Sequence, residues 1–586
     1  MNDIGILSLT RFGDLVQTSP VTSALRRLHP GARIHLIVKS RFRAVAEMLP
    51  GVDVVHEIDG DALACLLTQP GTPFSECYET LLQLVERLRC VSFDWLCNLT
   101  HSRASAVLLS LLDAPRTTGF TLDRAGHRRV DEAWLTHMGT LVRARRLMRL
   151  NLVDSYLGAT GALGQGERLS VRIPAEARAR AAELLPDGRR FVAVQLGASQ
   201  DAKTWSVERY ARTITEIAQR RPDLEFALVG VAAEQARGSR LEQLCPSQPL
   251  LSLIGKTSIV ELGAVLSRCE LLLTGDTGTM HLAAAVGTRT CAIFVGLGSP
   301  YETAAYGEGH VALVSRLACA PCSHLVRCGR PICHEDMPPE WVARLVCAIL
   351  EGSPIAALEM LPRADVLITR FDENGLLELS PAHRRRPESH DLLALAYHAI
   401  YLEGLGGIEI DADSVRRRAQ DRFGVAPSAW QDHLPAELEA ELASLSALAR
   451  EGLGGAARLS EAFACDLCDN ARPEAVALAR RIGDTLAGID AEIYRLGRSS
   501  PLIKPLCLSL EGESESLPEA DVYTTAHAAA LSYASLAHRA DALRAFVVGE
   551  PLPEGSRPRR GPLTASTTGP QGRASRPNAG SSGRAA

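Results

Sequence analysis

The sequence carries no strong net charge and no long apolar run. Its 586 residues include 63 Lys and Arg against 68 Asp and Glu, a net charge of −5 at pH 7, which gives no global sign of a nucleic-acid partner. No apolar run reaches the ~18 residues typical of a membrane span. Met1–Asp3 lacks the basic region that opens a secretory signal, and neither a long apolar core nor a cleavage site follows. We therefore expect a cytoplasmic protein without nucleic-acid partners, whose contact with a membrane is at most peripheral.

The cysteines are interpreted against that reducing compartment. There are 15, and we expect them to be buried apolar side chains, metal ligands or reactive thiols before disulfides. Four form a C-x2-C-x5-C-x4-C pattern: Cys319, Cys322, Cys328 and Cys333. Four thiolates can hold one zinc or iron ion tetrahedrally, so a structural metal site is one interpretation. The spacing is not that of a standard zinc ribbon, and reduced thiols or a disulfide stay open as alternatives.

The length exceeds what one hydrophobic core usually supports, so about three domains are expected. Short apolar runs alternate with amphipathic segments in the first part of the chain, which is the βαβ pattern of a parallel sheet. Its predicted strands and helices are Ile4–Leu9, Pro20–Leu28, Ile34–Val38, Phe42–Leu49, Val52–Ile58, Phe93–Leu99 and Ala104–Leu112.

A second α/β unit begins near Arg190, where a buried strand is followed by a polar loop and an amphipathic helix. Its predicted elements are Phe191–Leu196, Val207–Arg220, Glu225–Val229, Ala233–Leu244, Ile259–Ser267, Leu271–Thr274, Thr290–Phe294 and Pro338–Leu350. Two doubly wound units in tandem direct the carboxyl ends of their strands toward a shared cleft, where ligands are expected.

The segment Leu273–His281 leaves an apolar strand and enters a small-residue helix, Leu282–Val286. The first N–H groups of a helix lack intrahelical partners and lie at the positive end of its dipole, and Gly278 allows a phosphate to approach the backbone. This predicts an anion site for a nucleotide-linked substrate. The alternative is a structural turn capped by Asp276.

Four segments in this order resemble glycosyltransferase family 9, which includes the ADP-heptose:lipopolysaccharide heptosyltransferases. They are Arg11–Pro20, Asn98–Arg103, the strand with its Lys203-Thr204-Trp205 loop, and Gly255–Ser258 leading to Gly275–His281. The resemblance covers roughly residues 4–350. It implies an α/β fold of the GT-B type, with two Rossmann-like doubly wound domains facing a cleft. The second domain would hold a nucleotide-diphospho-sugar donor and the first would hold the acceptor.

Asp14 and Lys203 are the predicted catalytic residues. Inverting sugar transfer needs a base for the acceptor hydroxyl, and Asp14 follows the first strand on a loop beside the cleft; the matching aspartate of the family implies the same role. Asp14 as a simple helix cap is the alternative. The departing diphosphate needs positive charge. Since no Asp-x-Asp metal motif is found in the cleft-forming segments, Lys203 is expected to supply it, and no cofactor is expected for catalysis.

The resemblance implies further binding residues. Glu234 matches the acidic residue that binds the donor ribose, His281 is expected either to donate to the phosphates or to pack, and Arg103 is expected on the acceptor side. Arg143, Arg145, Arg146 and Arg149 form a basic cluster that either meets phosphorylated core sugars or is a solvated helix face. The predicted donor-binding residues are Gly13, Ser199, Glu234, Asp276, Thr277, Gly278 and His281.

The sequence thus predicts four regions. Residues 1–172 form an acceptor-binding Rossmann-like domain, residues 173–352 a nucleotide-sugar-binding one, and residues 353–550 a mainly helical extension of unknown role. In that extension Ala364–Phe371 is predicted to pair as a hairpin with Leu376–Leu379. Residues 551–586 are rich in Gly, Pro, Ser and Arg and are predicted to be disordered.

The function predicted from these features is an inverting, metal-independent glycosyltransferase. The resemblance implies ADP-heptose as donor and the lipopolysaccharide inner core as acceptor, at the inner face of the inner membrane. One alternative replaces the acceptor by a protein, as in autotransporter heptosyltransferases. An alternative of another class is a non-catalytic assembly factor that binds nucleotide sugars, against which the presence of both Asp14 and Lys203 argues.

Overall fold

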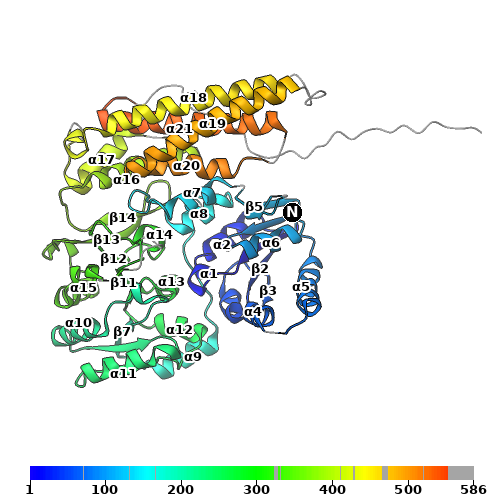
Figure 1. Cartoon of the computed structure of the whole chain (residues 1–586). Coiled ribbons are helices and arrows are strands. Elements are labelled where there is room, and N and C mark those ends of the chain that lie inside the picture. The colour runs from blue at the N-terminus through cyan, green and yellow to red at the C-terminus, as the bar shows by residue number, and fades with distance from the viewer. Residues whose placement is uncertain are drawn as a thin grey trace, which may run out of the picture.

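The computed structural model describes residues 1–551, except 70, 124, 131, 165, 323–327, 330, 410, 427–428, 465–472 and 519–520. The predicted disordered tail therefore lies outside the described residues, apart from Pro551. The chain forms two α/β units and a helical appendage, which we define as residues Ser389–Val548 (Figure 1). The prediction of two parallel-dominated α/β units followed by helices is confirmed.

The first unit is a six-stranded sheet in the order β3-β2-β1-β4-β5-β6. All neighbours are parallel except β5 and β6. Its strands are β1 (Asp3–Ser8), β2 (Arg33–Lys39), β3 (Val54–Ile58), β4 (Trp95–Asn98), β5 (Arg116–Leu122) and β6 (Arg128–Val130). Its helices are α1 (Phe12–Val16), α2 (Ser19–Leu28), α3 (Arg43–Met48), α4 (Gly60–Thr68), α5 (Phe74–Arg89), α6 (Arg103–Leu111), α7 (Ala133–Leu141) and α8 (Leu152–Ala159).

The central strand of this unit, β1, is buried along its whole length. It pairs Ile4 with Ile34 of β2 and with Trp95 of β4. A parallel strand with helices on both faces needs apolar side chains on both sides, which is why the run Ile4–Leu7 folds here. The sheet thereby fixes the loop after β1, where Asp14 lies.

The second unit is an eight-stranded sheet in the order β14-β13-β12-β11-β10-β7-β8-β9. Its strands are β7 (Arg190–Gln195), β8 (Leu224–Val229), β9 (Leu250–Ser252), β10 (Leu271–Gly275), β11 (Arg289–Phe294), β12 (Val311–Ser315), β13 (Ala364–Phe371) and β14 (Leu377–Pro381). Its helices are α9 (Ala175–Leu184), α10 (Val207–Arg220), α11 (Gln235–Leu244), α12 (Ile259–Leu266), α13 (Gly278–Ala285), α14 (Pro300–Thr303) and α15 (Pro339–Glu351).

The predicted hairpin extends this sheet. Strand β13 pairs antiparallel with β12, opposing Val311 to Ile368, and β14 pairs with β13. The sheet therefore continues to Pro381, past the domain boundary predicted at residue 352. The pairing covers the edge of β12, which would otherwise leave a row of unpaired backbone groups.

The appendage consists of α16 (Ser389–Gly406), α17 (Ala412–Phe423), α18 (Leu438–Ala464), α19 (Pro473–Ser499), α20 (Lys504–Glu515) and α21 (Val522–Val548). Helix α18 packs along α21, and α20 packs on α7 of the first unit. Figure 1 shows these helices as a layer above the two α/β units. Within the described residues, no helix is both long and apolar enough to cross a membrane.

A single apolar core joins the appendage to the α/β units. It runs from Ile4 in β1 through Trp134 in α7 to Leu393 in α16 and Leu543 in α21, all of them buried. A second core fills the other face of the second sheet, around Trp205, Tyr210 and Trp341. The appendage is thus part of the packed body of the protein.

Candidate active site at the junction of the two sheets

The two α/β units meet where β1 leads into α1 and β10 leads into α13. Helix α1 packs on α13, and a Cβ atom built on Gly13 would lie 2.7 Å from the Cα atom of Gly278. Gly278 in turn lies against the ring of Phe12. Arg11 Nη1 donates to Ser199 Oγ at 3.0 Å across the same junction. Glycine at both positions lets the two backbones touch, so the predicted acceptor and donor residues face each other here.

Asp14 lies in the first turn of α1 and is partly exposed. Its carboxylate accepts the backbone N–H of Arg11 at 3.3 Å, so the capping role is present in the structure. Burial raises the pKa of Tyr156, and the negative charge of Asp14 raises it further, which places this phenol near the carboxylate. A carboxylate that caps a helix through one oxygen can still accept a proton on the other, so capping and catalysis are compatible.

Lys203 ends a short 3-10 turn, Asp201–Lys203, after β7. Its Nζ lies 2.6 Å from Asp276 Oδ2, and both side chains are largely buried. Thr303 of α14 donates to the other oxygen of Asp276 at 3.1 Å. The carboxylate of Asp276 is therefore held between a cation and a hydroxyl, just before the N-terminus of α13.

His281 links the two sides electrostatically. Burial lowers the pKa of its ring, the charges of Asp276 and Asp14 raise it, and that of Lys203 lowers it again. One imidazole therefore lies within electrostatic reach of Asp14 from the first unit and of Lys203 and Asp276 from the second. Its Nδ1 is buried without a hydrogen-bond partner among the described residues.

Glu234 follows β8 and its side chain lies over Gly197 and Gly230 at the ends of β7 and β8. Its carboxylate accepts from Gln195 Nε2 at 2.8 Å and from the backbone N–H of Val231 at 3.1 Å. Burial raises its pKa. The Gln195 side chain also accepts from Thr279 Oγ1 at 3.2 Å, so Glu234 is connected to the first turn of α13.

Thr277 and Gly278 form the start of α13, as predicted from the anion-site motif. Thr277 is the N-cap, in extended conformation, and its hydroxyl contacts that of Thr274 at 3.1 Å rather than capping the helix. The hydroxyl thus leaves the N–H groups of the first turn to other partners. These N–H groups and the ammonium of Lys203, which is paired with Asp276, are the positive groups of this corner.

The sequence did not predict α14, nor the pairing of its Glu302 with Arg145. Glu302 of α14 binds Arg145 through both oxygens, at 2.6 Å and 2.9 Å. Arg145 also donates to the carbonyls of Leu297 and Cys322. Burial raises the pKa of Glu302, while hydrogen bonding to Arg145 lowers it. A signal for the helix itself was present, because Ser299 directly precedes Pro300, and proline is common at the first position of a helix.

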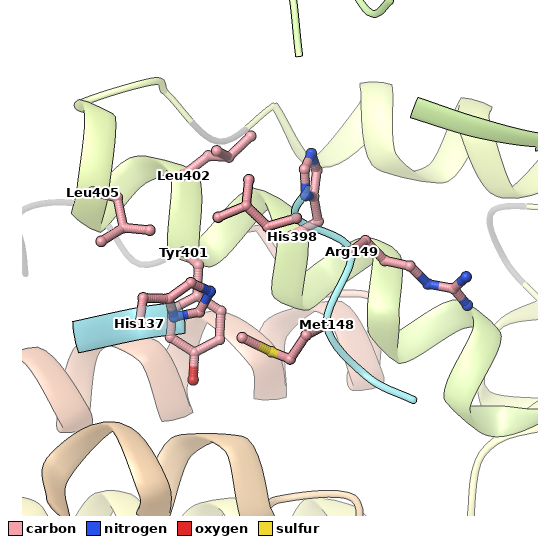
Figure 2. A pocket seen from close by; sticks show the side chains of 8 residues that line it. His137, Met148, Arg149, His398, Tyr401, Leu402 and Leu405 are labelled. Carbon is pink, nitrogen blue, oxygen red and sulfur yellow. The ribbon is translucent and has the colours of Figure 1, made fainter. Parts of the chain in front are cut away.

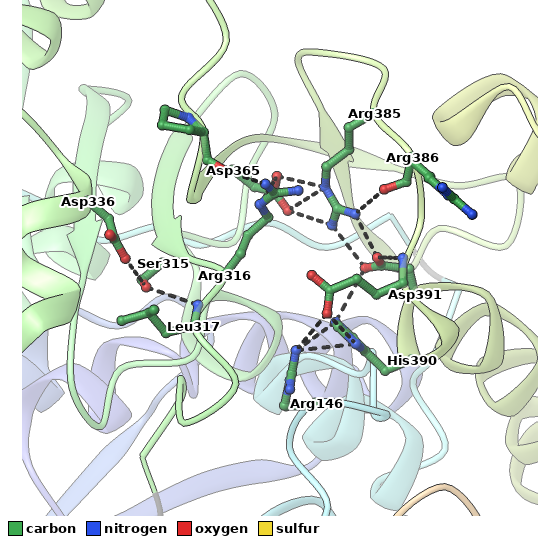
Figure 3. A network of polar contacts seen from close by, with 12 residues as sticks. Arg146, Ser315, Arg316, Leu317, Asp336, Asp365, Arg385, Arg386, His390 and Asp391 are labelled. Atoms are coloured by element: carbon green, nitrogen blue, oxygen red, sulfur yellow. Dashed lines mark hydrogen bonds and ion pairs between the residues drawn. The ribbon is translucent and has the colours of Figure 1, made fainter. Parts of the chain in front are cut away.

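The basic cluster proposed for acceptor binding is engaged inside the protein instead. Each of its arginines pairs with an acid elsewhere in the fold: Arg143 with Glu511, Arg145 with Glu302, Arg146 with Glu388, and Arg149 with Asp391. Figure 3 shows Arg146 beside His390 and Asp391, close to the Arg385–Asp365 pair. These ion pairs join the first unit to the second unit and the appendage. Arg103, by contrast, is exposed at the start of α6.

The predicted metal site is not supported. Cys319 and Cys328 are exposed, Cys322 is half-buried, Cys333 is buried, and all four are free thiols, so the disulfide interpretation is also excluded here. Burial raises the pKa of Cys322 and Cys333, and the neighbouring cysteines raise both further. In the described part of the chain, no three His, Cys, Asp or Glu side chains are arranged to hold one ion.

Comparison with known proteins assigns this junction. Residues 81–329 match the model of glycosyltransferase family 9 (heptosyltransferase). The chain is thus similar to glycosyltransferase family 9. The matched range includes Lys203, Glu234 and Asp276, whereas Asp14 precedes it. The similarity supports a glycosyltransferase, as the sequence predicted.

Relatives cover the α/β units at low identity. Lipopolysaccharide heptosyltransferase 3 of Escherichia coli is 24% identical over 288 residues, which are 48% of this chain and 80% of that protein. Lipooligosaccharide heptosyltransferase 2 of Campylobacter jejuni is 30% identical over 178 residues, 29% of this chain and 54% of that protein. The crystal structure of a family 9 glycosyltransferase from Veillonella parvula aligns with a TM-score of 0.50 at 20% identity, over 60% of this chain and 98% of that one. That likeness supports the GT-B fold.

Proposed function

We propose that this protein is a family 9 glycosyltransferase that transfers a heptose from ADP-heptose to the inner core of lipopolysaccharide, with inversion and without a metal ion, at the inner face of the inner membrane. The observation that carries the proposal is the meeting of Asp14 with Lys203 and Asp276 around His281, a carboxylate from one unit beside the cation of the other. The names of the relatives, lipopolysaccharide and lipooligosaccharide heptosyltransferases, support the choice of sugar and acceptor.

On the donor side, the diphosphate is assigned to the start of α13. The N–H groups of Thr277 and Gly278, the ammonium of Lys203 and the hydroxyl of Ser199 would bind its oxygens, and Gly13 leaves room beside them. Glu234 would accept from the ribose hydroxyls. Asp276 then loses Lys203 as its partner and is free to accept from hydroxyls of the sugar. His281 would donate to a phosphate oxygen from its ring.

On the acceptor side, Asp14 is assigned as the general base. It takes the proton of the acceptor hydroxyl while that oxygen bonds to the anomeric carbon from the face opposite the leaving diphosphate. The bond between the anomeric carbon and the diphosphate oxygen breaks, and the negative charge passes to oxygens held by Lys203 and α13. One displacement of this kind inverts the anomeric centre. Arg103, exposed on the same unit, would bind a phosphate group of the acceptor.

The test uses the full chain with a panel of nucleotide sugars and truncated lipopolysaccharide, with products detected by mass spectrometry and their anomeric form by NMR. We expect turnover with ADP-heptose and an inverted product. Asp14→Asn should lower kcat by about 100-fold or more while donor affinity changes little, because a general base contributes about 10²–10⁴-fold. Lys203→Gln should weaken donor binding.

The matched control is Asp201→Asn, in the same turn as Lys203 but with a side chain that is 94% exposed. It should keep wild-type turnover. Undiminished turnover by Asp14→Asn would reject the base, and transfer to a protein but not to lipopolysaccharide would replace the acceptor. Donor binding without any turnover would favour a nucleotide-sugar-binding assembly factor.

A further inference from the structure

Two adjacent cavities lie where the first unit, the second unit and the appendage meet. The first is lined by α7, by the segment after it and by α16, including His137, Met148 and Tyr401. Figure 2 shows these side chains and His398 gathered around it, with the guanidinium of Arg149 extending away from them. The second cavity lies next to the first and shares two lining residues with it, Arg149 and His398.

The second cavity is unusually rich in positive charge. Guanidinium groups of Arg149, Arg418 and Arg422 line it, together with the imidazole of His398, and Glu378 is the only carboxylate among its lining residues. The rest of the lining is the ring of Tyr301 and leucines of β14 and α16. Like charges this close repel one another, and the repulsion is strong where water is scarce.

The pKa values of the lining side chains Arg149 and His398 reflect that repulsion. Burial lowers the pKa of Arg149 to about 10, with Arg422 among the groups that lower it further. Burial lowers the pKa of His398 to about 4, and Arg418, Arg422 and Arg149 all contribute in the same direction. His398 is therefore neutral at pH 7, and the charged groups that line the cavity are the three guanidiniums and the carboxylate of Glu378.

Two donors in this cavity lack acceptors. Arg149 Nε and Arg422 Nε are both buried without a hydrogen-bond partner among the described residues. Side chains of Arg149 and Arg422 are only 12% and 10% exposed. An unpaired buried N–H of a charged group costs free energy, so an acceptor is expected between them.

The nearby carboxylates are already engaged. Glu378 pairs with Arg422 and accepts from Arg370 Nε at 2.7 Å. Asp391, 3.5 Å from Arg149, is held by Arg385 through both oxygens. On the outer side, Arg418 pairs with Glu373, and it also lies 3.7 Å from Asp372 and 3.6 Å from Glu378. These acids balance the surrounding network, yet none of them reaches the two unpaired Nε groups.

We propose that this cavity, bounded by Arg149, Arg418 and Arg422, is a binding site for a compact inorganic anion of the size of chloride or phosphate. Such an ion accepts from the unpaired Nε groups and screens the guanidiniums from one another. The space is too small for a nucleotide sugar, so the site is separate from the proposed donor site. Its occupant joins Arg149 of the first unit to Arg418 and Arg422 of the appendage.

The site is also connected, through Tyr301 and Thr303 of α14, to Asp276 of the proposed donor site. The guanidinium of Arg149 stacks on the ring of Tyr301, 3.6 Å from its centroid. Tyr301 belongs to α14, whose Thr303 donates to Asp276 beside Lys203. Anion binding therefore steadies the helix that holds Asp276.

The test measures thermal unfolding of the full chain against sodium chloride, sodium bromide and sodium phosphate at constant ionic strength. We expect a saturable rise in Tm with at least one of these anions, because a ligand that binds only the folded state stabilises it. A response to the halides alone identifies a halide site, and a response to phosphate alone identifies an oxyanion site. Arg418→Gln should weaken the apparent affinity about tenfold, as expected for the loss of one charge-assisted hydrogen bond.

The matched control is Arg417→Gln, the neighbouring residue of α17, whose side chain is 64% exposed and pairs with Asp411 outside the cavity. It should respond to the anions as the wild type does. Crystals of the unaltered protein soaked in bromide give a second measurement that needs no variant, with an anomalous peak expected between the three guanidiniums. Equal responses of Arg418→Gln, Arg417→Gln and the wild type, or the absence of both saturation and an anomalous peak, would overturn the proposal.

Discussion

Asp154 is a carboxyl group held wholly inside the protein. It is buried in α8, accepts from Tyr306 Oη at 2.8 Å, and accepts from the backbone N–H of Leu377 at 3.1 Å. Burial raises its pKa to about 7, although these two hydrogen bonds lower it. One side chain of the first unit thus contacts the loop after α14 and the start of β14 in the second unit.

The titration of Asp154 should make stability depend on pH. In the unfolded chain the carboxyl ionises near the ordinary aspartate pKa of 3.8, whereas in the folded protein it does so only near 7. Its contribution to stability is therefore fully present below pH 4, is lost as pH rises toward 7, and is constant above that. From pH 5 to 7 the loss amounts to about 2 kcal/mol, because the slope of about 1.4 kcal/mol per pH unit falls as the pH approaches the folded pKa of about 7.

Urea unfolding of the wild type and Asp154→Asn at pH 5, 6, 7 and 8 measures this effect. The free-energy difference between them should shift in favour of the variant up to pH 7 and then level off. Asp187→Asn, at a carboxyl that is 93% exposed, should give a difference that stays nearly constant with pH. A constant difference for Asp154→Asn as well would show that this carboxyl is ionised in the folded protein throughout.

The candidate site shows which residues can be predicted from the sequence. Asp14, Lys203 and Asp276 each follow a strand at its carboxyl end, so the topology brings them together once both units are recognised. Arg145 and Glu302 gave no such signal, because their pairing joins residues 157 positions apart and depends on how the two units dock. For the cysteines, the spacing suggested metal ligands, but no three His, Cys, Asp or Glu side chains in the described part of the chain are arranged around one ion.

Helix α18 runs from Leu438 to Ala464 through three glycines, Gly452, Gly454 and Gly455. Glycine in a helix interior is unfavourable by local propensity. A Cβ atom on Gly452 would lie 2.5 Å from the ring of Tyr533 in α21. The tyrosine is fixed in place by a 2.7 Å hydrogen bond to Asp490 of α19. The close contact between α18 and α21 therefore explains why residue 452 is a glycine, although glycine disfavours a helix interior.

Gly452→Ala and Gly454→Ala should have opposite effects on stability. Both replace a helical glycine, which favours the folded state by up to about 1 kcal/mol. Nothing lies within 4 Å of the added methyl at residue 454, whereas at residue 452 it meets the tyrosine ring. We expect Gly454→Ala to raise Tm and Gly452→Ala to lower it, since overpacking costs about 1–3 kcal/mol. Thermal unfolding followed by circular dichroism distinguishes them, and equal shifts would contradict this account of α18.

Other elements followed from local patterns. Helix α10 was predicted with its observed ends, Val207–Arg220, because Ser206 caps it and its apolar positions recur at helical spacing. Helix α20 (Lys504–Glu515) was not predicted. Polar residues occupy its exposed side, and the helix is stabilised by packing on α7 and α19. Local signals identify elements that begin with a cap, whereas elements stabilised by distant contacts need the tertiary structure.

The appendage bears on how the whole molecule holds together. The ring centroid of His137 in α7 lies 4.2 Å from the ring centroid of Tyr401 in α16. Trp134, in the same helix, is 4% exposed and lies near Gly406 of α16. The Veillonella structure is matched over 98% of its length by 60% of this chain, so the remainder of this chain has no counterpart there. In this protein the face of α7 is covered by α16 and α20.

Removing the appendage should therefore destabilise the α/β units that remain. A chain ending at Pro387 keeps both sheets but uncovers Trp134 and the rest of that face, and it leaves Arg149 without Asp391. We expect Tm to fall on the order of 5–10 °C, since each kcal/mol of lost burial lowers Tm by a few degrees in domains of this size. Binding of a dye that fluoresces on apolar surfaces should rise in parallel. A control chain ending at Pro551 retains every described contact and should unfold like the full protein. If the chain ending at Pro387 matched the control in both measurements, the shared core would contribute little to stability, and the appendage would have to be regarded as an independently folded domain.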